Sequence, residues 1–181
     1  MKSPGNDLLL LAGKSLTLLI QGVMAFAAGV VALVAVTLPF VQDTIHAEMQ
    51  TEFGPDITAM PLGAVLGLLA VVCALCVLVF LFFGKLRGII DTVASGDPFV
   101  PENADRLSAM GWIQIAIYAL SFVATGAAAF VARWASQFAE TSIKGDFDVN
   151  VTPVLLILTL FILARVFRHG AAMREDLEGT V

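Results

Sequence analysis

Residues 61–83 have the sequence PLGAVLGLLAVVCALCVLVFLFF, in which no side chain is charged. A helix of about this length covers the roughly 30 Å of hydrocarbon in a bilayer, at about 1.5 Å per residue. Backbone polar groups inside a bilayer must be hydrogen-bonded within the protein, and an α-helix satisfies them within one segment. We therefore predict that residues 61–83 form a membrane-spanning helix.

Three other apolar segments of similar length lie on either side of this span, at residues 16–40, 114–131 and 149–167. Hydrophobic residues make up 59% of the chain and charged residues 14%. Soluble domains have roughly a quarter of their residues charged. The first apolar segment is also longer than the core of a secretory signal peptide. We predict an all-α fold, in which residues 1–181 form a single polytopic four-helix bundle surrounded by the lipid bilayer.

Lysine and arginine are concentrated in alternate connections, which predicts the orientation of the chain. Positive residues close to the ends of spans are retained in the cytoplasm. We therefore predict that both termini and the connection between the second and third spans are cytoplasmic. The residues on that side are Lys2, Lys14, Lys85, Arg87, Arg106, Arg165, Arg168 and Arg174, whereas the opposite side has Arg133 and Lys144.

The cytoplasmic connection after residue 83 continues with a helical pattern. Gly96 can adopt the left-handed conformation that ends a helix, and Pro98 prevents its continuation. Pro101 suits the first position of a new helix, with Glu102 near its positive end. This pattern predicts a cytoplasmic helical hairpin between the second and third spans. Its apolar positions at i, i+3, i+4 and i+7 are Leu86, Ile89, Ile90 and Val93.

The two connections on the opposite side have local patterns of their own. Residues 43–53 are predicted to form a short helix that ends at Gly54 and lies along the outer membrane surface. Phe147, Val149 and Val151 alternate with polar residues, and this period of two predicts a short strand before the fourth span.

Two segments carry a family resemblance. Residues 96–107, GDPFVPENADRL, resemble a G-x-P-F-x-x-x-N-x-x-x-L signature, and residues 163–170, LARVFRHG, with the terminal EGTV resemble a second one. Gly179 stands where the second signature has leucine. The chain is thereby similar to the bacterial four-helix membrane proteins of the domain of unknown function 2975 family (DUF2975). The resemblance implies a bacterial cytoplasmic membrane location and a small helix-turn-helix transcription factor as a partner. It implies no enzymatic activity.

Reactive side chains within the spans are limited to a Cys-x-x-Cys pair, Cys73 and Cys76. Such a pair could act as a membrane thiol oxidoreductase or bind a soft metal. A thiolate near the bilayer centre is costly, however, and a buried cysteine usually behaves as a small hydrophobic residue. We predict the structural role.

Candidate metal ligands are incomplete. His46 with Glu48 and Glu52 provides one imidazole and two carboxylates, fewer ligands than a structural zinc site has. Asp146, Asp148 and Asn150 resemble the start of a calcium loop, but Val151 and Ile157 replace its glycine and glutamate. We predict no catalytic, cofactor-binding or metal-binding residues.

Polar residues in the spans are few, and none is acidic, which argues against ion-driven transport. Small residues spaced four apart predict close helix packing, either within the bundle or between copies in a homo-oligomer. The alternative to close packing is a lipid pocket lined by the hydroxyl groups of such rows. They are Ser121, Thr125 and Ala129; Gly63 and Gly67; and Ala25 and Gly29.

The hairpin is the segment in which we expect function. Phe99 is a large apolar residue in a turn that should face water, and Asn103 lies early in the next helix. Either Phe99 folds back and Asn103 caps the turn, or the turn is a docking surface for a cytoplasmic protein. The candidate partner-binding residues are Gly96, Pro98, Phe99, Asn103 and Leu107.

Our functional hypothesis is a non-enzymatic sensory or regulatory module that acts through this hairpin. The alternative is a small transporter, channel or lipid-binding membrane protein. The sequence contains no basic block typical of nucleic-acid binding, so we predict no direct contact with nucleic acid.

Overall fold

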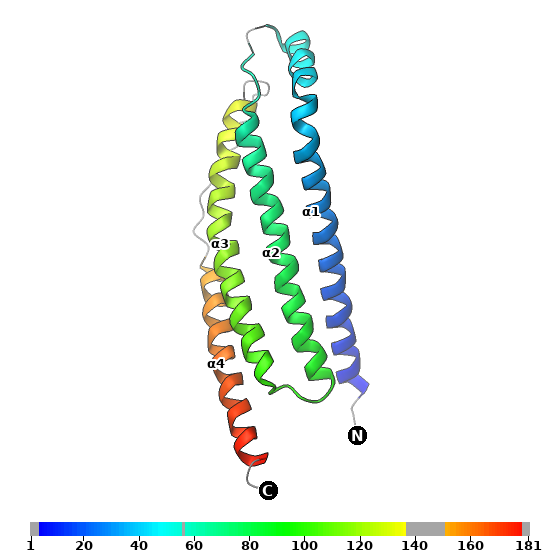
Figure 1. Ribbon diagram of the computed structural model, residues 1–181, viewed down its shortest axis with the longest axis vertical. Helices are drawn as coiled ribbons and strands as arrows, with labels where there is room; N and C mark the ends of the chain where they lie inside the picture. The colour runs from blue at the N-terminus through cyan, green and yellow to red at the C-terminus, as the bar shows by residue number, and fades with distance from the viewer. Residues whose placement is uncertain (1–3, 56, 137–150, 179–181) are drawn as a thin grey trace. The chain divides into compact units, whose positions relative to one another are not determined.

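The computed structural model describes residues 4–55, 57–136 and 151–178, and within these ranges it contains four helices and no strand (Figure 1). They are α1 (Pro4–Phe53), α2 (Leu62–Ala94), α3 (Pro101–Ala135) and α4 (Thr152–Glu178). Each is long and apolar enough to cross a membrane. The predicted all-α fold is thus confirmed for the described residues, with four helices that are suited to spanning a membrane. Most of the predicted strand, including Phe147 and Val149, lies outside the described residues.

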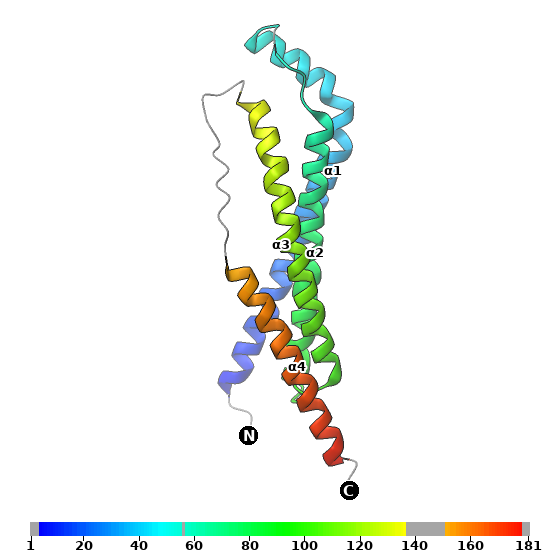
Figure 2. The ribbon, with the colours of Figure 1, turned by 90° about the vertical axis from the view of Figure 1, so that its left-hand side faces the viewer.

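The helices extend past the predicted spans, most of all α1. We predicted a separate helix at residues 43–53, and this prediction is wrong because α1 continues unbroken from Pro4 to Phe53. No glycine interrupts residues 41–53, and Pro39 is accommodated inside the helix. Gly54 then ends α1 with a φ of 103°, as predicted. Figure 2 shows the C-terminal end of α1, in cyan, turning aside from the rest of the helix.

The chain packs as two compact units, each built from parts of several helices. The first comprises residues 1–25, 77–118 and 150–181, and the second comprises residues 26–76 and 119–149. The first unit therefore contains the α2–α3 turn, α4 and the beginning of α1.

The core of the first unit lies where α3 and α4 meet α2. Its buried residues are Leu107, Met110, Leu160 and Ala164, and Phe82, Leu86, Ile89 and Phe167 pack around them. In Figure 2, α4 runs beside the first part of α3. The helices approach closely because Gly111 has no side chain: a Cβ there would lie 2.9 Å from the ring of Phe161.

Two polar contacts join α1 to α2 in the first unit. Lys14 Nζ donates to Asp91 Oδ1 at 2.8 Å, and Gln21 Nε2 donates to the carbonyl oxygen of Phe80 at 3.3 Å. Parts of all four helices therefore belong to this unit.

The second unit has no buried residue among those described. Trp134 Nε1 donates to the carbonyl oxygen of Thr58 at 3.0 Å, which joins α3 to the α1–α2 connection. Large side chains such as Phe26 and Phe40 are 74% and 83% exposed. Such apolar faces are suited to contact with lipid chains.

Three glycines of the small-residue rows do not contact a neighbouring helix closely within the described residues. A Cβ added at Gly29, Gly63 or Gly67 would meet nothing within 4 Å. Of the two alternatives that we predicted, these glycines do not show close packing within the bundle, because four-residue spacing does not indicate whether a row faces a neighbouring helix; packing between copies stays a prediction. Thr125 uses its hydroxyl within α3, donating to the carbonyl oxygen of Ser121 at 2.9 Å.

Candidate functional site

The α2–α3 turn begins with a left-handed glycine. Gly96 has a φ of 89°, which a residue with a Cβ rarely adopts. The backbone N–H of Gly96 donates to Val93 O at 3.1 Å, and that of Asp97 donates to Thr92 O at 3.0 Å. This pair of hydrogen bonds is the Schellman motif. The predicted helix end at Gly96 is confirmed, as is the start of α3 at Pro101.

Asn103 is the centre of a buried hydrogen-bond network beneath the turn. Its side chain is 0% exposed. The amide Nδ2 donates to Thr92 Oγ1 at 2.7 Å and to the carbonyl oxygen of Pro98 at 2.9 Å. The amide Oδ1 accepts a hydrogen bond from Arg106 Nη1 at 2.7 Å. One side chain thus connects the end of α2, the turn and α3.

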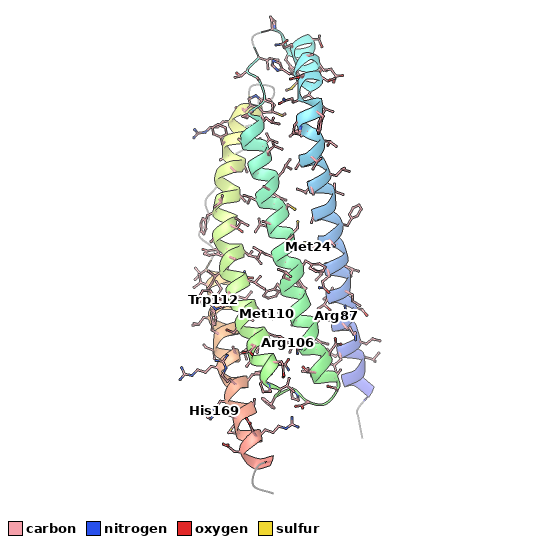
Figure 3. The ribbon with its side chains drawn as sticks, in the orientation of Figure 1. Met24, Arg87, Arg106, Met110, Trp112 and His169 are labelled. Carbon is pink, nitrogen blue, oxygen red and sulfur yellow. The ribbon has the colours of Figure 1, made fainter. Side chains whose placement is uncertain are left out.

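Arg106 and Thr92 extend the network along α2. Arg106 Nη1 also donates to the carbonyl oxygen of Gly88 at 3.0 Å, and the Thr92 hydroxyl donates to that of Ile89 at 2.8 Å. Arg106 lies between α2 and α3 (Figure 3). Within the described part of the chain, no buried side-chain nitrogen or oxygen lacks a partner. A fully satisfied network of this kind makes the turn rigid.

Phe99 packs against α4 and is also partly exposed. Its ring centroid lies 5.4 Å from that of Phe167. Gly170 permits this approach, since a Cβ there would be 2.8 Å from the Phe99 ring. Phe99 nevertheless remains 43% exposed. The ring of Phe99 therefore folds back onto α4, as one of our two interpretations predicts. Part of its surface nevertheless remains exposed.

Two exposed ion pairs also join α4 to the hairpin. Arg174 pairs with Asp97 in the turn. Arg168 Nη2 lies 3.4 Å from Asp105 Oδ1 on α3. Exposed pairs contribute at most about 1 kcal/mol each, so they orient α4 more than they stabilise it.

Two grooves are lined in part by Phe99. The α4 groove, of about 700 Å³, is lined by Phe99, Ile162, Arg165, Val166, His169, Gly170 and Met173. The turn groove, of about 320 Å³, is lined by Asp97, Phe99, Val100, Pro101, Ala171, Arg174 and Glu175. Phe99 lines both, so a molecule bound in either groove would touch this ring.

The five predicted partner-binding residues separate into two layers. Gly96 is exposed, Pro98 is half-buried and Phe99 is 43% exposed. Asn103 and Leu107 are buried beneath them, at 0% and 6% exposure. The first three can touch a partner directly, whereas the other two support the turn from inside.

Sequence reasoning missed several residues of this region. Arg106 follows Asn103 by one helical turn, and this spacing could have indicated the pair. Thr92 and Gly170 gave no such signal because their roles depend on residues far away in the chain.

The other described sequence candidates, on α1 and α2, belong to the second unit. Cys73 and Cys76 are free thiols. His46 Nε2 lies 3.0 Å from Gln50 Nε2 on the same helix, and Glu48 and Glu52 are exposed. Among the described residues, no three histidine, cysteine, aspartate or glutamate side chains gather as a metal site would require. Asp146, Asp148 and Asn150 lie outside the described residues.

A family model described as a protein of unknown function (DUF2975) matches residues 11–181, nearly the whole chain. The chain belongs to the DUF2975 family. The match includes both segments on which the resemblance was based, residues 96–107 and 163–170. In this DUF2975 member the two segments meet in space, because Phe99 of the first packs against Phe167 and Gly170 of the second. Comparison with curated proteins and with solved structures finds no match.

Proposed function

We propose that this DUF2975 protein is a membrane-embedded regulatory module that presents the α2–α3 turn to a cytoplasmic protein. The observation that carries the proposal is that Phe99 packs against α4, remains 43% exposed and lines two grooves. Aromatic residues that are seated in a packed environment are typical centres of protein–protein interfaces.

The rigidity beneath the turn supports a binding role. Binding is weakened when loops and side chains must be ordered as the complex forms. The Asn103 network and the Schellman motif order the turn in advance. The residues that converge here make structural contacts, so we propose recognition rather than catalysis.

The basic residues around the turn support a cytoplasmic location. Lys85, Arg87 and Arg106 flank the hairpin, and Arg165, Arg168 and Arg174 lie on the adjoining part of α4. Positively charged segments next to spans are retained in the cytoplasm. Membership of the family leads us to propose a small helix-turn-helix transcription factor as the partner.

The proposed orientation predicts that the α2–α3 turn and the residue after α3 are labelled from opposite sides of the membrane. In a Cys73→Ala, Cys76→Ala background, a membrane-impermeant maleimide should label a Ser95→Cys variant only after cells are opened. A Ser136→Cys variant, at the other end, should be labelled in intact spheroplasts. Both serines are exposed, so access from one side or the other determines the result. Labelling of the Ser95→Cys variant in intact spheroplasts would contradict the orientation.

Removal of the Phe99 ring is expected to weaken partner capture strongly. The Phe99→Ala variant should retain roughly thirtyfold less partner in a pull-down from solubilised membranes, since a hot-spot residue contributes about 2 kcal/mol or more. Phe122→Ala is the matched control, because Phe122 on α3 is 44% exposed and lies outside the hairpin. Equal retention by wild type and the Phe99→Ala variant would exclude this docking site.

A further inference from the structure

We infer that the α4 groove binds one anionic phospholipid at the membrane interface. The inference concerns a ligand site on α4 and does not depend on a protein partner at the turn. It rests on the apolar stripe in the groove, on Arg165 and His169, which pair with no other described residue, and on the level of the groove relative to the membrane.

The groove floor has the chemistry of an acyl chain site. Ile162, Val166 and Met173 are 54%, 54% and 53% exposed. They lie on one face of α4, and the groove extends for roughly 16 Å along the helix at about 1.5 Å per residue. Phe99 forms part of the opposite wall. An acyl chain beside Ile162, with the glycerol and head-group region of the same lipid along Val166 and Met173, would cover surface that is otherwise exposed.

Charge complementarity indicates an anionic head group. Arg165 and His169 line the groove, and no acidic residue does. Across the described ranges neither makes a hydrogen bond or an ion pair, whereas nearby Arg168 and Arg174 pair with aspartates. A guanidinium group binds a phosphate with two parallel hydrogen bonds, and an imidazole always has at least one N–H to donate.

The level of the basic residues places the groove at the interface. Leu86 and Ala164 belong to the same core cluster, so Lys85 and Arg87 lie at about the same level as Arg165. Basic residues at the ends of spans mark the boundary of the hydrocarbon. Ile162 then lies on the hydrocarbon side of Arg165, and His169 lies on the water side.

An exposed tryptophan agrees with this boundary. Trp112 is 65% exposed and packs edge-on against Phe161, with ring centroids 5.7 Å apart. Tryptophan is enriched at the membrane interface. Figure 3 shows Trp112, Arg106 and His169 following one another toward the C-terminal end of α4. The groove therefore begins near the hydrocarbon boundary and continues through the head-group region.

A second copy of the chain is a poorer occupant than a lipid. A dimer in a membrane has its two-fold axis along the bilayer normal, so equivalent residues face one another. Pairing through the α4 groove would bring Arg165 close to the same residue of the other copy, and like charges repel. An anionic lipid instead neutralises the charge.

Native mass spectrometry of the purified full-length protein tests the site. Protein equilibrated with equal amounts of dioleoyl phosphatidylglycerol and dioleoyl phosphatidylcholine should retain one phosphatidylglycerol in preference. The Arg165→Gln, His169→Ala double variant should reduce that preference at least about tenfold, a factor that corresponds to losing one charged contact. Arg168→Gln is the matched control and should stay within about twofold of wild type, because Arg168 already pairs with Asp105 and lies outside the groove.

Three outcomes would overturn the inference. They are an absence of preference in the wild type, a double variant that behaves as wild type, and a control that loses as much as the double variant.

A photoreactive residue at Val166 in native membranes provides a second measurement. An adduct with the mass of an anionic phospholipid is expected, and an adduct with a protein in its place would show that a protein occupies the groove.

Discussion

Replacement of Asn103 by alanine is expected to lower the free energy of unfolding by about 3 kcal/mol. The substitution removes the acceptor for Arg106 Nη1 and the donor to both Thr92 Oγ1 and the carbonyl oxygen of Pro98. A buried polar group that loses its partner costs about 1–3 kcal/mol, and a charged one costs more. The three partners lose these hydrogen bonds together, and only Arg106 Nη1 and the Thr92 hydroxyl keep another one, each to a carbonyl oxygen of α2. Thermal unfolding of the purified protein, followed by circular dichroism, measures the effect.

The neighbouring residue provides the control for the Asn103→Ala variant. Glu102 is exposed in the first turn of α3, and Glu102→Ala should change stability by about 0.5 kcal/mol, the size of one helix-dipole contribution. If Asn103→Ala were as mild as Glu102→Ala, the buried network would not be what fixes the turn.

Substitution of Gly111 by leucine is expected to destabilise the protein by about 2–3 kcal/mol. Gly111 is buried, and a Cβ there would lie 2.9–3.1 Å from three atoms of the Phe161 ring. That ring packs against Trp112, so its movement would disturb a second contact between α3 and α4. A lower midpoint in thermal unfolding, with weaker protection of α4 from proteolysis, checks this expectation.

Gly126 is the matched control on the same helix. A Cβ at Gly126 would meet nothing within 4 Å. Gly126→Leu should therefore be neutral or should stabilise α3 by about 0.5–1 kcal/mol, because glycine is a poor helix former. Equal destabilisation by the two leucine variants would mean that the close contact with Phe161 is not what makes Gly111 necessary.

The parts of the fold that could be predicted are those with local causes. The hydrocarbon thickness determines how long an apolar helix must be, so each of the four spanning helices was evident from composition and length. The end of α2 was also local, because Gly96 and the prolines that follow restrict only their own backbone. The continuation of α1 to Phe53 was missed because we expected residues 43–53 to form a separate helix along the membrane surface, whereas α1 runs unbroken through them.

Contacts between distant segments could not be predicted in this way. Gly63 and Gly67 have the spacing of a packing motif, yet a Cβ at either meets nothing, whereas Gly111 and Gly170 have no such spacing and lie against aromatic rings. Which face of a helix meets a neighbour depends on the whole arrangement. For Asn103, the sequence suggested a cap on the turn, but its contact with Thr92 on the preceding helix appears only in the folded chain.

Photocrosslinking at position 99 in native membranes tests the proposed function most directly. A photoreactive residue replaces Phe99, the same residue at Phe122 provides the control, and mass spectrometry identifies the products. Our account predicts that a small cytoplasmic DNA-binding protein is captured from position 99 and not from position 122. Capture of this chain alone from position 99 would contradict the account, and the turn would then have a structural role only.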